Sequence, residues 1–396
     1  MNRRTARQLI IASAAIGSLG TFALHLILPS LPAIRAHFGS SSGTTQLLVS
    51  LGLLAFALGQ LAVAPWSDRI GRRPVILAGL ALFCVGSILG LAAPSIGMLI
   101  AARIVQAFGS GAAMAVGRAT IMDYFGPERV ASGIAWSATA IVLVPLVAPA
   151  VGGFVVEWRG WRMLFVLCVL LGAAVFAFSW LRVRETRAAG PRAPRAQSAL
   201  ASYGQLLRAP DYFIFVLYGS FMVAGVYAFI AGAPYVAMDV MNLSPSYYGR
   251  LFILPAVATF VGFFLAARIT RHYGMLRMMT AGLTLTCAGG VAMLALALLG
   301  VMHPLALFVP MAAANVGNAL SAPSTLGGAV AARPGIAGAA SGLMGFKQLL
   351  LAAVAAQIVA SFAHRSTVPL ACTIAACNAL ALLCYLRVRP HALRMR

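Results

Sequence analysis

The stretch Gln60-Leu-Ala-Val-Ala-Pro-Trp-Ser-Asp-Arg-Ile-Gly-Arg-Arg-Pro-Val75 places a dense group of charges between two long apolar runs. Such a group stands out in a chain of which 61% is hydrophobic and only 9% is charged. The mean hydropathy is +0.93. No soluble fold buries so much apolar surface, so we predict that lipid is the solvent for most of the chain.

Apolar runs long enough to cross a bilayer recur along the whole sequence. A helix needs about 20 residues to span a hydrocarbon layer of ~30 Å, and about twelve runs meet this requirement. We therefore predict an all-α integral membrane protein with twelve transmembrane helices. The predicted spans are Leu9–Leu31, Thr45–Ala64, Pro74–Ala93, Ile96–Asp123, Ala131–Val156, Trp161–Leu181, Tyr212–Val236, Tyr247–Ala267, Met275–Val301, Leu305–Ala331, Gly338–Phe362 and Val368–Leu386.

The positive residues behind the net charge of +22 lie mainly in short loops between the predicted spans. They do not gather on one face that could bind nucleic acid. Arginines gather in alternate short loops, whereas the opposite loops carry only scattered charges. The positive-inside rule therefore places both termini in the cytoplasm. The main clusters are Arg3, Arg4 and Arg7; Arg69, Arg72 and Arg73; Arg182, Arg184, Arg187, Arg192, Arg195 and Arg208; and Arg387, Arg389, Arg394 and Arg396.

One break in composition divides the spans into two sets. The segment from Arg182 to Pro210 is rich in Arg, Ala, Pro and Ser, and its prolines prevent a continuous helix. We predict an N-terminal six-helix bundle over residues 1–182, a cytoplasmic central loop over 183–210 and a C-terminal six-helix bundle over 211–396. The turn around Gly71 recurs around Gly274, an offset of 274 − 71 = 203 residues. Such a weak repeat indicates two bundles related by a pseudo-two-fold axis around a central site.

Other classes of protein lack support in this sequence. The first apolar run is long enough to be a retained helix, and no convincing signal-peptidase site follows it. All six cysteines fall inside predicted spans without a CxxC pair, so we expect no disulfide framework, metal site or cofactor. An intramembrane enzyme or a sensor would need a nucleophile and base set, an HExxH motif, a phosphate-cradling glycine loop or an added soluble domain, and none is found.

Several motifs in a fixed order resemble the major facilitator carriers, and in detail the Bcr/CflA-type bacterial drug-resistance exporters. The resemblance extends over nearly the whole chain. It rests on Phe56 to Pro74, Leu28-Pro-Ser-Leu-Pro32, Arg103-Ile-Val-Gln106, Gly117-Arg-Ala-Thr-Ile-Met-Asp123, Ala148-Pro-Ala-Val-Gly-Gly153, Trp161-Arg-Met-Leu-Phe165, Phe229-Ile-Ala-Gly-Ala-Pro234 and Ala337-Gly-Ala-Ala-Ser-Gly-Leu-Met-Gly345.

This resemblance implies a proton-driven exporter of the bacterial inner membrane that alternates between inward-open and outward-open states. The sequence also departs from the family pattern. Ala64 and Ala107 stand where glycine is usual, and Met122 precedes Asp123 where arginine is frequent. Related exporters tend to carry an acidic residue in the first span, where this chain has His25.

Few ionisable residues lie within the predicted spans, and each costs about 2.5–3.5 kcal/mol or more at the bilayer centre. No carboxylate lies in the middle of a span. We therefore consider His25, Arg103 and Lys347 as candidates for proton coupling, with His25 first because imidazole titrates near physiological pH. His25 and Arg103 lie at similar depths, roughly 9 Å from the periplasmic side, so they could approach each other. The alternative is that each serves packing: His25 and Arg103 as bonded polar groups, and Lys347 as an amine that extends to the cytoplasmic surface.

Two other groups of residues point to conformational change. We predict that Asp68, Arg69, Gly71, Arg72, Arg73 and Asp123 form a gating latch, in which Asp68 accepts bonds from the amides at a helix N-terminus and the arginines face lipid or acids. Pro145, Pro149, Gly152 and Gly153 break regular packing in the fifth span. The resemblance implies that these four belong to a motif typical of exporters, and the alternative is a passive kink.

Polar and aromatic residues on otherwise apolar spans are the candidates for a substrate cavity, although each is also a candidate for helix packing. These residues are Gln46, Gln60, Gln106, Tyr218, Phe221, Met222, Tyr227, Asn315, Asn318, Gln348 and Gln357. A weakly charged cavity favours neutral or amphipathic compounds such as phenicol-like drugs. A metabolite or amino-acid exporter of the same family, or a carrier without proton coupling, remains open. We expect a monomer whose partners are small molecules, protons and the lipid bilayer, with no nucleic acid.

Overall fold

The computed structural model describes the backbone of residues 3–185, 199–332, 336–362 and 366–394. Within these ranges, side chains are described except at 3–7, 64–65, 68–69, 121–143, 145–146, 199–202, 271, 337–338 and 388–394. The described backbone contains helices, turns and bends, and no strand. The all-α prediction is therefore confirmed.

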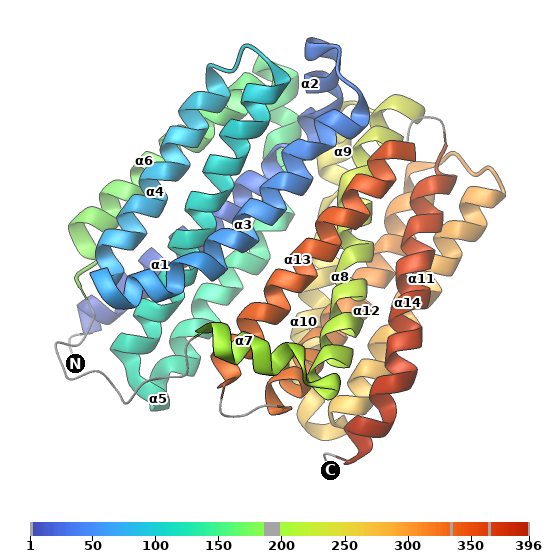
Figure 1. The fold of residues 1–396 in the computed structure, drawn as a ribbon. Coiled ribbons are helices and arrows are strands. Elements are labelled where there is room, and N and C mark those ends of the chain that lie inside the picture. The colour runs from blue at the N-terminus through green and yellow to red at the C-terminus, as the bar shows by residue number, and fades with distance from the viewer. Residues whose placement is uncertain (1–2, 186–198, 333–335, 363–365, 395–396) are drawn as a thin grey trace. The chain divides into compact units, whose positions relative to one another are not determined.

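The chain divides into two compact units, Met1–Ala193 and Pro194–Arg396. Figure 1 shows that both units consist of long helices joined by short connections. The first contains α1 (Arg3–Leu26), α2 (Leu31–Phe38), α3 (Ser42–Ile70), α4 (Arg72–Leu91), α5 (Ile96–Arg159) and α6 (Arg162–Arg182). The second contains α7 (Ala199–Leu207), α8 (Pro210–Tyr235), α9 (Pro245–Leu251), α10 (Ile253–Tyr273), α11 (Met275–Leu298), α12 (Pro304–Ala331), α13 (Ala337–Phe362) and α14 (Val368–Arg394).

Eleven helical segments among the described residues are long and apolar enough to cross a membrane. They correspond to all the predicted spans except the fifth, Ala131–Val156. That span falls in the second half of α5, where residues 121–143 have no described side chains. The protein is thus a multi-pass membrane protein, as its sequence predicts.

Helix α5 is assigned as 64 consecutive residues, yet its two halves pack against the same helix, α1. A methyl group built on Gly20 would lie 2.9 Å from Cβ of Ser110, and one built on Gly152 would lie 2.3 Å from the Leu26 carbonyl oxygen. The two points on α1 are 26 − 20 = 6 residues apart, while those on α5 are 152 − 110 = 42 residues apart, or ~63 Å along a straight helix. Therefore α5 bends back on itself and supplies two layers of the first unit.

Close helix packing in the first unit depends on glycine. A methyl group on Gly59 of α3 would lie 2.3 Å from the Phe108 carbonyl oxygen of α5, and one on Gly111 of α5 would lie 2.2 Å from the Phe56 carbonyl oxygen of α3. Each helix thus presents a glycine to the backbone of the other. In lipid, where the hydrophobic effect does not drive helices together, such close approach supplies the dispersion contacts that hold a bundle.

Two predicted boundaries differ from the structure. The charged stretch was expected as a loop after Ala64, but α3 continues to Ile70 and the turn is Gly71 alone. The predicted central loop over 183–210 contains the short helix α7, which begins after the proline-rich part of the segment. Residues 186–198 lie outside the described backbone, so the bundle and loop boundaries stay a prediction.

We expect Gly111→Ala to destabilise the first unit by about 1–3 kcal/mol, because the added methyl group forces α3 and α5 apart. Thermal unfolding of the purified protein in detergent measures this as a lower midpoint. Gly97→Ala is the matched control: Gly97 lies on the same helix with nothing within 4 Å of its built methyl group. The control should be neutral or slightly stabilising because alanine favours helix, and equal midpoints for the two variants would contradict the packing assigned to Gly111.

Candidate functional site

The turn between α3 and α4 is held by a carboxylate that follows α6, the last helix of the first unit. Gly71 has a φ of 108°, a left-handed conformation that glycine adopts without steric cost. The Glu185 carboxylate, just after α6, accepts hydrogen bonds from the backbone amides of Arg72 at 2.9 Å and Arg73 at 3.1 Å. These amides are the first two of α4, where the helix dipole is positive. Glu185 is therefore an anionic cap on α4.

The two arginine side chains extend this contact to α3 and α6. Arg72 donates from Nη1 to Ser67 Oγ at 2.6 Å. Arg73 donates from Nη2 to the Trp180 carbonyl oxygen at 2.8 Å, and its guanidinium carbon lies 5.3 Å from the centre of the Trp180 ring. A methyl group on Gly71 would lie 2.6 Å from a Glu185 carboxylate oxygen. We call the set Ser67, Gly71, Arg72, Arg73, Trp180 and Glu185 the α4 cap.

The acceptor at the start of α4 is Glu185, which was not among the residues predicted for the latch. The prediction that Asp68 accepts bonds from helix amides is not tested by this contact. The side chains of Asp68, Arg69 and Asp123 lie outside the described residues, so their part in a latch stays a prediction. One signal could have identified Glu185: it is the acid nearest the end of the sixth span, in a segment otherwise dense in arginine.

His25 lies near the end of α1 and is 5% exposed. Its Nδ1 lies 2.8 Å from the Thr21 carbonyl oxygen. Because a carbonyl oxygen only accepts, Nδ1 carries a hydrogen and is the donor of this bond. The expectation that His25 and Arg103 approach each other finds no direct bond: among the described residues, no hydrogen bond joins the two side chains.

Arg103 belongs to a short polar chain across α4 and α5. Its Nη1 donates to Gln106 Oε1 one turn along α5. The Gln106 amide nitrogen then donates to Ser87 Oγ of α4 at 2.7 Å, and that hydroxyl donates to the Phe83 carbonyl oxygen at 2.7 Å. Arg103 and Gln106 are 2% and 0% exposed. Gln106 is thus committed to helix packing and to holding Arg103.

Lys347 lies in the second unit, on α13. Its Nζ is 4.0 Å from the centre of the Phe213 ring of α8. A cation over an aromatic face is a favourable electrostatic arrangement. The half-buried amine therefore has an aromatic partner near the first turn of α8.

Three of the predicted cavity residues of the second unit bind neighbouring helices. The Tyr218 hydroxyl donates to the Met279 carbonyl oxygen of α11 at 3.2 Å. Asn315 donates to the Pro255 carbonyl oxygen of α10 at 3.0 Å, and Asn318 to the Met222 carbonyl oxygen of α8 at 2.7 Å. These contacts give each of the three a packing role.

The remaining cavity candidates differ in burial. Gln46 is fully buried, and neither its amide nitrogen nor its amide oxygen has a hydrogen-bond partner among the described residues. Met222 is buried, whereas Gln60, Phe221, Tyr227, Gln348 and Gln357 are half-buried. Access of these residues to a substrate stays a prediction.

In the fifth span, Gly152 permits the approach of α1 described above, and Pro149 and Gly153 are buried beside it. The side chain of Pro145 lies outside the described residues. Glycine at 152 thus has a packing reason, and a specific role in export stays a prediction.

Comparison with known proteins identifies the family. The sequence pattern of the family described as Major Facilitator Superfamily matches residues 11–356. The chain belongs to the major facilitator superfamily. It is therefore a transporter and not an enzyme.

Named relatives of this facilitator chain confirm the resemblance to Bcr/CflA-type drug-resistance carriers. It is 28% identical to Multidrug resistance protein D of Escherichia coli (strain K12), over 100% of this chain and 98% of the relative. It is 30% identical to the Chloramphenicol resistance protein of Pseudomonas aeruginosa, over 81% of this chain and 76% of the relative. The structure of a bacterial homolog to the human lysosomal transporter Spinster aligns with a TM-score of 0.78 and 16% identity, over 100% of this chain and 99% of that chain. That likeness shows the fold alone.

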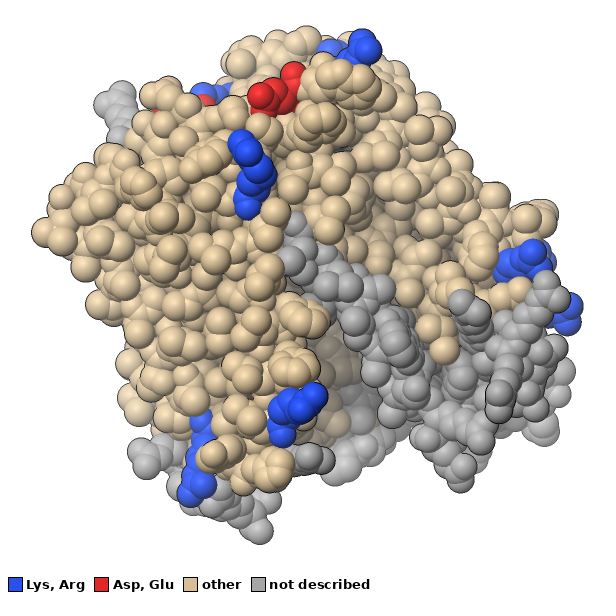
Figure 2. All heavy atoms as spheres, turned by 180° about the vertical axis from the view of Figure 1, so that it is seen from behind, with Lys and Arg blue, Asp and Glu red and all other residues tan. Residues whose placement is uncertain are grey.

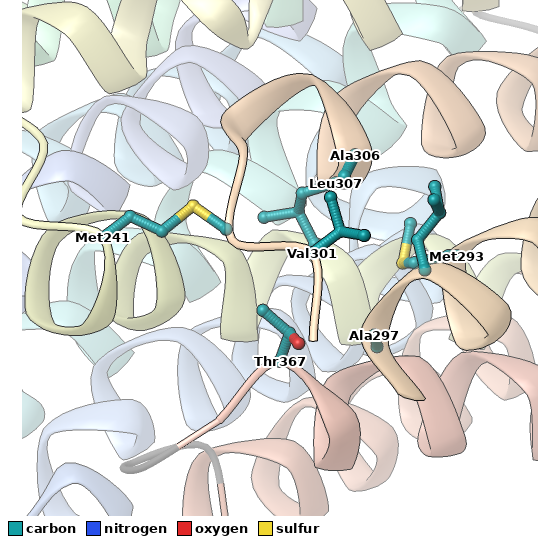
Figure 3. Close-up of a pocket in the computed structure, with 8 residues that line it drawn as sticks. Met241, Met293, Ala297, Val301, Ala306, Leu307 and Thr367 are labelled. Carbon is teal, nitrogen blue, oxygen red and sulfur yellow. The ribbon is translucent and has the colours of Figure 1, made fainter. Parts of the chain in front are cut away.

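One small cavity of this facilitator chain lies in the second unit. Figure 3 shows Met241, Met293, Val301 and Thr367 around it, approaching from separate segments. Its volume is ≈ 10 Å³. Drug-sized ligands need about 300–1,000 Å³, so this cavity is not the site of such a substrate.

The surface of this facilitator chain agrees with a membrane setting. Figure 2 shows Lys and Arg in a few small groups, separated by broad areas of other residues. Exposed large apolar side chains include Phe154, Leu181, Val291, Leu298 and Leu383. Such side chains are suited to lipid, since Lys and Arg are costly within the hydrocarbon layer.

We expect Glu185→Ala to loosen the first turn of α4, because two amides lose a charged acceptor worth about 1–2 kcal/mol. Hydrogen–deuterium exchange should be about tenfold faster in the peptide that carries the Arg72 and Arg73 amides. Glu157→Ala is the control, because Glu157 is an exposed carboxylate at the end of α5 in the same unit. Unchanged exchange at Arg72 and Arg73 in the Glu185 variant would contradict the cap.

Proposed function

We propose that the chain exports small neutral or amphipathic compounds from the bacterial cytoplasm in exchange for protons. The observation that carries this proposal is its full-length kinship with a protein named for multidrug resistance. The relative named for chloramphenicol resistance extends the argument to a neutral drug class. Export proceeds by alternating access, in which two bundles open in turn to either side of the membrane.

The composition of the spans supports a weakly charged substrate. No Asp or Glu lies in the middle of a predicted span, so a cationic compound has no central carboxylate to pair with. Aromatic and methionine side chains such as Phe221, Met222 and Tyr227 adapt to apolar ligands of different shape. Gln348 and Gln357 add hydrogen-bonding capacity on α13.

Proton coupling is assigned first to His25. The bond from Nδ1 to the Thr21 carbonyl oxygen fixes the ring orientation and leaves Nε2 as the proton acceptor. Because His25 stands where related exporters tend to have an acid, it takes over the exchange of a proton with the two sides of the membrane. Arg103 and Lys347 are the further coupling candidates.

The α4 cap supports the gating role proposed for the latch around Gly71, Arg72 and Arg73. It connects the ends of α3, α4 and α6 by hydrogen bonds, so that the first unit moves as a rigid body during alternating access. Asp68, Arg69 and Asp123 would complete the latch. Gly152 allows the second half of α5 to pack closely on α1, and Pro149 and Gly153 are buried beside it.

The placement in the cell follows from the charge pattern. The excess of arginine in alternate loops supports a protein of the bacterial inner membrane with both termini in the cytoplasm. We propose that the transporter works as a monomer.

Resistance in a pump-deficient bacterial host tests the function. Expression should raise the inhibitory concentration of phenicol-like drugs several-fold, and a protonophore at a sublethal dose should abolish the increase. A metabolite or amino-acid exporter is the alternative if a broad drug panel shows no effect. A carrier without proton coupling is the alternative if resistance survives the protonophore.

Substitution of His25 tests its part in coupling. We expect His25→Ala to reduce proton-driven drug transport in vesicles at least tenfold, whereas His25→Glu restores a group that exchanges protons and retains part of the activity. His272→Ala is the control, because His272 is exposed at the end of α10. Proton-driven transport that survives His25→Ala unchanged would exclude this residue as the coupling group.

A further inference from the structure

The buried Arg103 guanidinium has unused hydrogen-bonding capacity. A guanidinium carries five N–H donors, and here only Nη1 has a protein acceptor, the Gln106 side chain. Among the described residues, no group accepts a bond from Nε or Nη2, and both atoms are buried. Gln106 cannot supply more, because its amide nitrogen is a donor committed to Ser87. The free donors therefore call for an acceptor from outside the protein chain.

Arg103 also lines a small cavity within the first unit, between α1, α5 and α6. The other walls are Ala23 and Leu26 of α1, Ile27 just after it, and Leu164, Phe165 and Cys168 of α6. The volume of this cavity is ≈ 10 Å³. A volume of about 10–15 Å³ on this measure holds one water-sized occupant. A substrate molecule or a phosphate is too large for it.

Among the described residues of the first unit, no carboxylate contacts the Arg103 guanidinium. The first unit carries acids at Asp68, Asp123, Glu128, Glu157 and Glu185. Glu157, near the end of α5, and Glu185, just after α6, are exposed. Asp123 lies 123 − 103 = 20 residues from Arg103 along α5, or ~30 Å, and Glu128 lies farther along.

Asp68 is also too far along its helix. A methyl group built on Gly52 of α3 would lie 3.9 Å from Arg103 Nη2, which marks where α3 passes the guanidinium. Asp68 lies 68 − 52 = 16 residues beyond that point, or ~24 Å. A desolvated cation without a counter-ion costs several kcal/mol. The arrangement therefore favours an anion in the cavity over a neutral occupant.

We propose that the cavity at Arg103 binds one small monovalent anion of halide type, with chloride as the physiological ligand. Nε and Nη2 donate to the anion, and the electrostatic attraction offsets the burial of the guanidinium. The apolar side chains of α1 and α6 limit the size of the ligand and exclude bulk water. The anion takes the role of counter-ion to Arg103, which no carboxylate among the described side chains of the first unit fills. This site does not depend on the direction of transport or on the drug exported.

Equilibrium binding of radioactive chloride to the purified full chain tests the proposal. In a gluconate buffer of constant ionic strength, the wild type should bind chloride saturably at about one ion per chain, and bromide should compete. Arg103→Gln should weaken binding at least tenfold. Arg118→Gln is the matched control, because Arg118 is an exposed arginine on the same helix, and it should bind as the wild type does.

A second variant leaves the guanidinium in place. Ala23→Val adds two methyl groups to the wall of the cavity and should also abolish chloride binding. Crystals grown in bromide should show an anomalous peak within hydrogen-bonding distance of Arg103 Nε and Nη2, which locates the ion even if a variant fails to fold. The proposal is overturned if the wild type shows no saturable binding, if both variants bind normally, or if the bromide peak lies elsewhere.

Discussion

The need to satisfy every backbone polar group without water shapes this protein. In a hydrocarbon layer an unpaired amide or carbonyl costs several kcal/mol, so the chain forms helices wherever it crosses. Hydrogen bonds other than those within the helices are then confined to helix ends and to a few buried side chains. The α4 cap is the clearest case, since two free amides at the start of α4 receive the Glu185 carboxylate from a segment more than 110 residues away.

The lipid solvent also limits how helices associate. Because lipid is as apolar as leucine, close approach of backbones replaces hydrophobic burial as the source of attraction. Gly59 and Gly111 bring α3 and α5 together, and Gly20 and Gly152 bring α1 against both halves of α5. The buried chain from Arg103 through Gln106 to Ser87 adds hydrogen bonds across the same bundle. A cation held there without a carboxylate is the unusual element, and it motivates the anion site.

The predicted spans match the helices closely because hydropathy and length determine what can cross a bilayer. The ends of helices were less predictable. Asp68 and Arg69 were expected in a loop but belong to the last turn of α3, since polar residues continue a helix beyond the hydrocarbon layer. The residues of the candidate cavity were also hard to predict from sequence. Asn315, Asn318 and Tyr218 were selected as polar residues in apolar spans, yet they donate hydrogen bonds to carbonyl groups of neighbouring helices.

The sequence by itself determined the class, the number and order of the spans, the family and the candidates for proton exchange. These follow from composition, periodicity and motifs, which are local properties. Only the tertiary structure decided that Glu185 caps α4, that α5 folds back along α1, and that Arg103 Nε and Nη2 lie buried beside a small cavity with no acceptor among the described residues. Those results depend on contacts between residues far apart in the chain. Thus the charged stretch from Asp68 to Arg73 indicated the family, whereas only the folded structure showed that Glu185 binds the amides of Arg72 and Arg73.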